Sequence, residues 1–178
     1  MTKYIVLLRG INVGGHKKVP MAELRELLSK SGFENVSTYI QSGNVILQSK
    51  EENSQNIEKT IQKAIKNYFE FDVPVIAKTR TQLQIIFDAC PFSKEKKENS
   101  YFIIFNEIPK RDLIDLVSSI SFENEEFVII NDCLYYHSSK GYGQSKFNMN
   151  SFEKKLNVKA TSRNYKTMLK LIAISSEN

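Results

Sequence analysis

Cysteine and long apolar runs are scarce in this chain of 178 residues. Its two cysteines, Cys90 and Cys133, lie beside apolar residues, which predicts two buried small side chains rather than a disulfide framework or a zinc site. The longest apolar runs, such as residues 4–8, have only four or five members, whereas about 20 are needed to cross a bilayer. We therefore expect no metal and no membrane span. Because no apolar leader precedes the first strand-like run, we expect a cytoplasmic protein.

Composition and charge are those of an ordinary globular protein. Apolar residues make up 41% and charged residues 25% of the chain, which excludes disordered and fibrous classes. The net charge is a mild +5, but residues 137–178 hold eight basic and two acidic side chains. This basic C-terminal region is either a binding surface for an anionic partner or a face that docks on the acidic segment before it.

Residues 1–78 show a regular alternation of strand and helix patterns. The apolar spacing and the turn residues predict, in order, a strand over 3–8, a helix over 20–31, strands over 36–41 and 45–48, a helix over 54–69 and an edge strand over 73–77. With right-handed crossovers, the order βαββαβ places both helices on one face of a four-stranded antiparallel sheet.

The second half nearly repeats this order without visible sequence repetition. Its patterns predict a helix over 81–89, a solvated loop over 94–99, a strand over 101–105, a helix over 111–120, a hairpin of 127–130 with 133–136, and two final helices. The first of these begins after Asn150, with Glu153 in a capping-box position, and the second begins after Thr161. The expected fold is therefore α+β: two ferredoxin-like (split βαβ) halves, residues 1–78 and 79–178, with antiparallel sheets packed into one compact unit.

The loop from Arg9 to Lys18 is the first candidate site. Gly10, Gly14 and Gly15 expose backbone N–H groups, and with Arg9 and Lys17 they can cradle an anion such as phosphate. The spacing matches neither a P-loop nor a dinucleotide fingerprint. The alternative is that the glycines only allow a sharp turn.

Three further polar segments have both a functional and a structural interpretation. Residues 41–44 are either ligand contacts or turn residues, and residues 138–146 are either a basic lid over a ligand or a mobile connector. Residues 161–167 are interpreted as the polar start of the last helix, where an arginine in the first turn calls for an anionic partner, either a ligand or an internal carboxylate.

No conventional catalytic constellation is visible. His16 and His137 lie on different loops, and neither a nucleophile elbow nor a zinc-protease helix occurs. The aromatic residues of strands 101–105 and 133–136 favour core packing over an RNA-stacking platform because their neighbours are aliphatic. Whether the protein is an enzyme stays open, with His16 as the candidate acid or base.

Taken together, the motifs resemble those of a known family. Residues 7–15 (LLRGINVGG), 19–25 (VPMAELR), 39–45 (YIQSGNV) and 161–171 (TSRNYKTMLKL) are similar to the bacterial DUF1697 family. The resemblance spans nearly the whole chain, with Tyr165 as the main departure, where related sequences often carry tryptophan. It implies a single α+β domain of two ferredoxin-like halves and brings no established reaction, substrate or cofactor.

The family pattern is concentrated in polar loops, which favours ligand binding. We expect a phosphate-bearing small molecule or nucleotide to be bound through the glycine-rich basic loop. The candidate ligand residues are Arg9, Asn12, Gly14, Gly15, Lys17, Ser42, Asn44, Lys146, Arg163 and Asn164. The alternatives are a nucleic-acid-binding module that uses the basic C-terminal region and a structural or partner-binding protein. We further expect the Arg9 loop and the Ser42 turn to lie at opposite ends of their sheet; the oligomeric state cannot be predicted.

Overall fold

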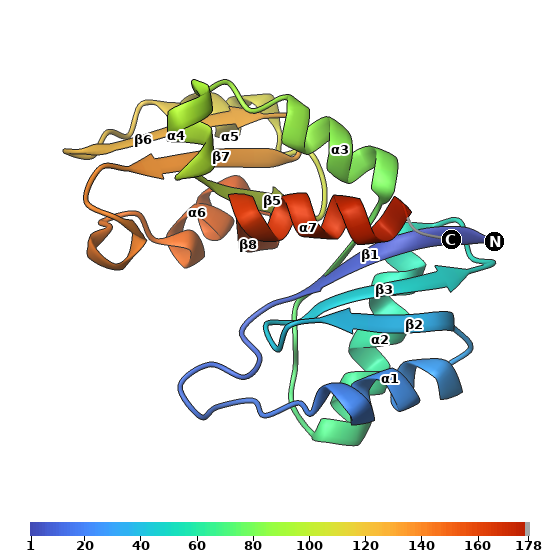
Figure 1. Ribbon diagram of the computed structural model, residues 1–178. Helices are drawn as coiled ribbons and strands as arrows, with labels where there is room; N and C mark the ends of the chain where they lie inside the picture. The colour runs from blue at the N-terminus through green and yellow to red at the C-terminus, as the bar shows by residue number, and fades with distance from the viewer. Residues whose placement is uncertain (177–178) are drawn as a thin grey trace. The chain divides into compact units, whose positions relative to one another are not determined.

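The computed structural model describes residues 1–176 and divides into two compact units, residues 1–83 with 171–176, and residues 84–170 (Figure 1). Each unit contains a four-stranded antiparallel sheet with flanking helices, which confirms the α+β class. Among the described residues, no helix is long and apolar enough to cross a membrane. No group of three or more His, Cys, Asp or Glu side chains within residues 1–176 is arranged to hold a metal ion.

The first unit follows the expected βαββαβ order. Its elements are β1 (Thr2–Leu8), α1 (Met21–Lys30), β2 (Glu34–Tyr39), β3 (Asn44–Ser49), α2 (Ser54–Phe69) and β4 (Val75–Thr79). The sheet order is β2-β3-β1-β4, so β4 lies at an edge, as its proline-containing approach predicted.

Both helices of the first unit pack on one face of its sheet. Every second residue of β1, beginning with Tyr4, belongs to a core that includes the apolar stripes of α1 and α2. The stripe of α2 is Ile57, Ile61 and Ile65, all buried at the i, i+4, i+8 spacing of one helix face. Asn53 caps this helix, since its side chain accepts a hydrogen bond from the backbone N–H of Gln55.

The second unit repeats the order in full. After α3 (Arg80–Asp88), which begins in the first unit, its elements are α4 (Lys94–Glu98), β5 (Tyr101–Phe105), α5 (Arg111–Ser118), β6 (Glu125–Ile130), β7 (Cys133–Ser138), the short 3₁₀ turn η1 (Tyr142–Gln144), α6 (Met149–Leu156) and β8 (Ala160–Asn164). Helix α7 (Tyr165–Ser176) begins in the second unit and ends in the first. The sheet order is β6-β7-β5-β8, the counterpart of the first sheet.

Strand β8 was missed by the sequence patterns, which assigned residues 161–164 to the start of the last helix. These residues instead pair with β5, from Tyr101 opposite Asn164 to Phe105 opposite Ala160. The pairing is long-range, so no local pattern encodes it. The helix begins only at Tyr165, because Asn164 caps it by accepting a hydrogen bond from the N–H of Thr167.

Two local expectations for the second unit are also wrong. Residues 94–98 form the helix α4 rather than a loop; Ser93 caps it, Glu95 lies in its first turn, and Lys96 and Lys97 lie in its last turn, which suits the helix dipole. Glu153 does not form a capping box. Asn148 caps α6, whereas Glu153 accepts the N–H of Ala160 at 2.7 Å.

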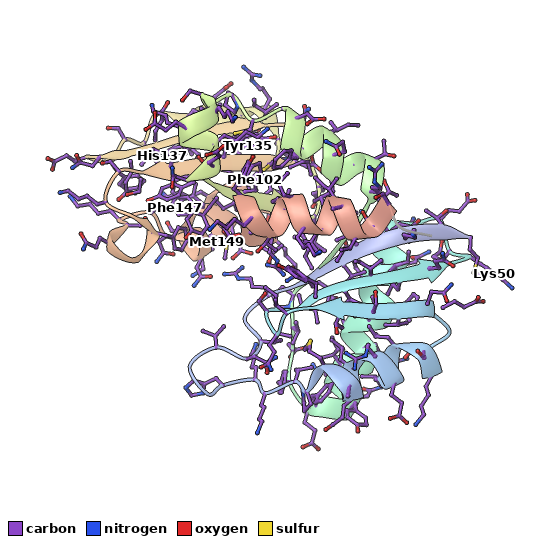
Figure 2. The ribbon with its side chains drawn as sticks, in the orientation of Figure 1. Lys50, Phe102, Tyr135, His137, Phe147 and Met149 are labelled. Atoms are coloured by element: carbon purple, nitrogen blue, oxygen red, sulfur yellow. The ribbon has the colours of Figure 1, made fainter. Side chains whose placement is uncertain are left out.

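Four aromatic side chains of the second sheet are buried core residues, Phe102, Phe105, Tyr135 and Tyr136, whereas Tyr101 is partly buried. Phe102 and Tyr135 lie on neighbouring strands with ring centroids 5.7 Å apart, and both are fully buried (Figure 2). The Tyr135 hydroxyl donates to the carbonyl of Ile86 in α3 at 2.6 Å, and Phe87 stacks on Phe102. The RNA-stacking interpretation therefore has no exposed aromatic surface at these positions.

Candidate functional site

The glycine-rich loop of the first unit is a small hairpin. The N–H of Asn12 donates to the carbonyl of Lys17, and the N–H of His16 donates to the carbonyl of Val13. Gly14 and Gly15 are the two central residues of this turn, with φ angles of 58° and 77°. Two successive positive φ values are the signature of a type I′ turn, which glycine adopts without steric cost. The glycines thus have a sufficient structural reason to be there.

Asn12 ties this hairpin to its surroundings. Its Nδ2 donates to the carbonyls of Val19 and Gln41 at 2.9 and 2.8 Å, and its Oδ1 accepts the N–H of Val19 at 2.8 Å. The contact with Gln41 joins the hairpin to the turn between β2 and β3. All three bonds hold backbone groups, so Asn12 organises the loop.

The Arg9 loop and the Ser42 turn were expected at opposite ends of the sheet, and this expectation is wrong. Strand β1 runs antiparallel to β3, with Leu7 opposite Asn44. The end of β1 therefore meets the start of β3, and the N–H of Leu8 donates to the carbonyl of Gly43 at 2.7 Å. The N–H of Arg9 reaches the carbonyl of Pro74 at 3.1 Å, so the approach to β4 joins the same end.

The other candidate residues at this end of the sheet also contact protein groups. Lys17 Nζ donates to the carbonyl of Asp72 at 2.6 Å. Asn44 is fully buried, and its Nδ2 donates to the carbonyl of Tyr39 and to the Ser42 hydroxyl. The structure brings Arg9, Asn12, Lys17, Ser42 and Asn44 to one sheet end, where their described contacts join three loops.

The three candidate residues of the second unit do not share a site. Arg163 is buried, and its Nη1 donates to the Thr161 hydroxyl and to the carbonyl of Ser162, both at 2.8 Å; burial lowers its pKa to about 10. Lys146 has an exposed side chain, while its backbone N–H donates to Glu125. Asn164 borders a cavity at the opposite end of the sheet from the β6–β7 turn.

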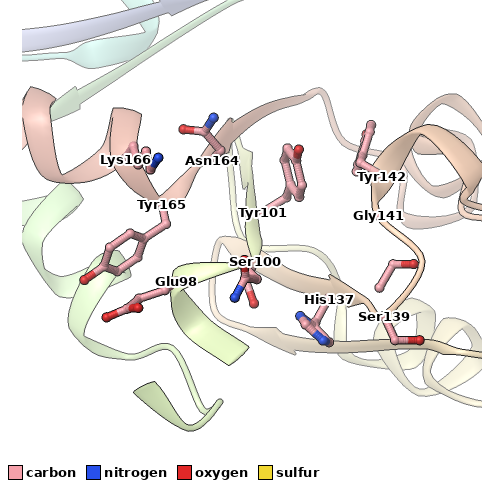
Figure 3. A pocket seen from close by; sticks show the side chains of 12 residues that line it. Glu98, Ser100, Tyr101, His137, Ser139, Gly141, Tyr142, Asn164, Tyr165 and Lys166 are labelled. Carbon is pink, nitrogen blue, oxygen red and sulfur yellow. The ribbon is translucent and has the colours of Figure 1, made fainter. Parts of the chain in front are cut away.

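That cavity has a volume of about 590 Å³, which lies within the usual range for small-molecule sites. It forms where β5 begins and where β7 and β8 end, and the loop after β7 closes one side. Figure 3 shows Lys166, Asn164 and Tyr101 on one side of it and His137 with Ser139 on the other. Its lining residues are Glu98, Asn99, Ser100, Tyr101, His137, Ser138, Ser139, Gly141, Tyr142, Asn164, Tyr165 and Lys166.

His137 is the most unusual polar group of this wall. Its Nδ1 is buried and makes no hydrogen bond within residues 1–176. The ring lies near Phe92, at 6.3 Å between centroids, a contact that offers no polar partner. A buried nitrogen without a partner loses its hydration on folding, a cost of about 1–3 kcal/mol that a bound group or water would offset.

The opposite wall carries positive potential. Helix α7 begins there, and the first N–H groups of a helix have no intrahelical partners and form the positive end of its dipole. Lys166 lies in that first turn and adds a full charge. The one carboxylate among the lining residues, Glu98, belongs to α4. The wall therefore suits an anionic group, and Glu98, which Figure 3 shows beside Tyr165, is an acceptor for hydroxyls.

The two cysteines do not supply a nucleophile. Cys133 is buried and Cys90 is half-buried, and neither forms a disulfide. Burial raises the pKa of the Cys90 thiol, so this side chain stays protonated near neutral pH.

Most residues of the cavity were noted in the sequence only separately, His137 as a loop residue and Tyr101 as a strand aromatic. What places them together is the pairing of Tyr101 with both Tyr136 and Asn164. Since β8 had no sequence signal of its own, the sequence offered no means of bringing Asn164 and Lys166 to His137.

Comparison with known proteins identifies the family and the fold. Over its whole length the chain is similar in structure to the conserved bacterial protein SP0830 from Streptococcus pneumoniae, with a TM-score of 0.80, 25% sequence identity and 99% of both chains covered. No curated protein matches the sequence. The profile of the family described as "Protein of unknown function (DUF1697)" matches residues 1–135, about three quarters of the chain. The resemblance of the glycine-rich loop and the turn after β2 to that family is thereby confirmed, and the chain belongs to the DUF1697 family.

Proposed function

We propose that the protein binds a small phosphate-bearing molecule in the cavity of its second unit. The observation that carries the proposal is a cavity of about 590 Å³ whose lining joins the start of α7 and Lys166 to His137. The Nδ1 of His137 has no hydrogen-bond partner in the described residues, and a turn of its ring toward the cavity would let a ligand satisfy this nitrogen. The volume suits a metabolite rather than a single ion.

Charge supports a phosphate as the recognised group. The α7 N-terminus and Lys166 offer donors and positive potential on one wall. Glu98 is suited to accept hydrogen bonds from the hydroxyls of a sugar or polyol. The glycine-rich loop of the first unit is the less favoured place, because Asn12 and Lys17 already bond to backbone carbonyls there.

Calorimetry with ribose 5-phosphate at low salt tests the proposal. We expect binding by the natural protein and at least about tenfold weaker binding by Lys166→Gln, since a charge-assisted hydrogen bond contributes about 1.5–3 kcal/mol and about 1.4 kcal/mol is tenfold. Lys170→Gln is the matched control, because it removes the same charge from an exposed position of the same helix outside the cavity. This control is expected to keep its affinity within about twofold.

Three results would contradict the proposal. Equal losses in Lys166→Gln and Lys170→Gln would mean that the general charge of the helix is responsible. Loss of binding in Arg9→Ala would move the site to the glycine-rich loop. Binding confined to single-stranded RNA or DNA and removed by modest salt would favour the nucleic-acid module, because such binding depends steeply on ionic strength.

A further inference from the structure

We infer that the ligand of this cavity carries a planar aromatic ring beside its phosphate, as a nucleoside monophosphate does; the inference rests on the proposed function. The observation behind it is a pair of tyrosines in the cavity wall. The rings of Tyr101 and Tyr142 have centroids 4.4 Å apart and planes inclined by 34°, and both residues line the cavity. Aromatic faces of this kind are the usual stacking surface for nucleobases.

Tyr101 is the fixed member of the pair. It begins β5, where it pairs with Tyr136 on one side and with Asn164 on the other. A residue held in the ladder from both sides keeps its position, so its ring forms a rigid wall. Figure 3 shows it next to Asn164 and facing Tyr142.

Tyr142 is the movable member, because it lies on a short segment between two anchors. The segment before it is held where the N–H of Ser139 donates to the carbonyl of Asn124. After it, the carboxylate of Glu125 accepts hydrogen bonds from the backbone N–H groups of Lys146 and Phe147. Both anchors lie outside residues 140–144.

Within the segment, the backbone hydrogen bonds are local. Gly141 donates to the carbonyl of Ser138, Gln144 donates to that of Gly141, and Ser145 donates to that of Tyr142. Gly141 has a φ of 82°, and around both it and Gly143 the space where a Cβ would lie is open. A shift of residues 140–144 therefore has to loosen the bonds to Ser138 and Ser145 at its ends and to move the ring of Tyr142 along that of Tyr136, which lies edge-on at 5.7 Å between centroids.

A ring between the two tyrosines requires their separation to grow from 4.4 Å to about 7 Å, twice the contact distance of stacked carbon atoms. The phosphate then has a place within reach, since the strand partner of Tyr101 is Asn164, the cap of α7. The ring and the phosphate thus occupy adjoining parts of one cavity, ordered as in a nucleoside monophosphate.

The inference is tested by titrating the protein with four kinds of probe: the ribonucleoside 5′-monophosphates one at a time, ribose 5-phosphate, inorganic phosphate and adenosine. The chain contains no tryptophan, so Tyr142→Trp provides a single fluorescent reporter at the stacking position. We expect at least one nucleoside monophosphate to bind about tenfold more tightly than ribose 5-phosphate and to change the emission of Tyr142→Trp.

Variants separate the ring from the phosphate. Tyr142→Leu should abolish the tenfold advantage of the nucleotide and leave the affinity for ribose 5-phosphate unchanged, whereas Tyr142→Phe should keep the advantage. Tyr68→Leu, which alters an exposed tyrosine of the first unit, should change neither affinity.

Equal affinities of the natural protein for every nucleotide and for ribose 5-phosphate would overturn the ring inference and leave the proposed function standing. Binding of adenosine as tightly as of its monophosphate would overturn the proposed phosphate site. If none of the probes binds, both are overturned.

Discussion

The two units close the same end of their sheets in the same way with different side chains. In the first unit, the N–H groups of Leu8 and Arg9 donate to the carbonyls of Gly43 and Pro74, at 2.7 and 3.1 Å. In the second, Phe105 and Asn106 donate to Asp132 and Lys159, at 2.8 and 3.0 Å. The backbone arrangement is thus shared although the sequences show no repetition.

The two units differ in the number of side-chain hydrogen bonds that hold the loop at that end of the sheet. The connection from β1 to α1 is long, and it includes the glycine hairpin that Asn12 holds with three hydrogen bonds. The connection from β5 to α5 is short, and Asn106 accepts one bond there, from the N–H of Lys159 at 2.7 Å. A cluster of polar residues in a sequence can therefore indicate a long loop that needs side-chain hydrogen bonds to hold its shape, just as it can indicate a binding site.

The largest expected loss of stability comes from a substitution in the turn before β3, compared with one in the turn before β7. A Cβ at Gly43 would lie 2.7 Å from the Cβ of Leu8, and the φ of Gly43 is +85°. We expect Gly43→Ala to lower the free energy of unfolding by about 3 kcal/mol. Asp132→Ala, at the corresponding carbonyl, should cost about 1 kcal/mol or less, because Asp132 is not among the residues with positive φ.

Urea unfolding of both variants, followed by circular dichroism, measures this difference. Equal losses would mean that the two sheet ends are under the same steric constraint.

The second effect concerns the two asparagines. Asn12→Ala removes three hydrogen bonds to backbone groups and should cost about 2–3 kcal/mol. Asn106→Ala removes one described side-chain bond and should cost about 1 kcal/mol. Amide hydrogen exchange assigns the loss to a unit, since Asn12→Ala should speed exchange at Leu8 and spare Phe105. Unchanged exchange at Leu8 would show that Asn12 does not hold the loop.

Alkaline pH should weaken the second unit through a buried tyrosine. Burial raises the pKa of Tyr135 well above its ordinary value near 10. Above that value the unfolded chain loses a proton that the folded state retains, so stability present below pH 10 is lost as pH rises, by up to about 1.4 kcal/mol per pH unit. Tyr135→Phe should show a shallower decline between pH 10 and 11 than the natural protein. Parallel declines would contradict a raised pKa.

The smallest effect tests a backbone position that the two units share. Ile40 and Asn131 are the first residues after β2 and β6, with φ angles of 49° and 51°. Asparagine tolerates this conformation, whereas a β-branched residue is strained in it. Since Ile40 is 51% exposed, its replacement loses little packing. We expect Ile40→Asn to raise the free energy of unfolding by about 0.5–1 kcal/mol. A lower urea midpoint would indicate that the isoleucine contributes unrecognised contacts.

The elements that could be predicted from the sequence are those whose signals are local. Helix α2 begins and ends where it was predicted, because its isoleucine stripe and its Asn53 cap lie within one short stretch of the sequence. Strand β8 could not be predicted, since its order comes from pairing with β5 across more than fifty residues. The cavity forms only when that strand pairs with β5. The sequence therefore singled out some of its lining residues separately but did not predict that they lie together.

The edge strand β8 has a consequence for the behaviour of the protein at high concentration. Strands at sheet edges offer unpaired backbone groups to which other chains can add. In β8, the carboxylate of Glu153 accepts a hydrogen bond from the N–H of Ala160, and the guanidinium of Arg163 donates one to the carbonyl of Ser162. In the edge strand β4, the carboxylate of Glu58 likewise accepts a hydrogen bond from the N–H of Ala77. These charged side chains fill the positions that an incoming strand would need, and they thereby protect the protein against aggregation.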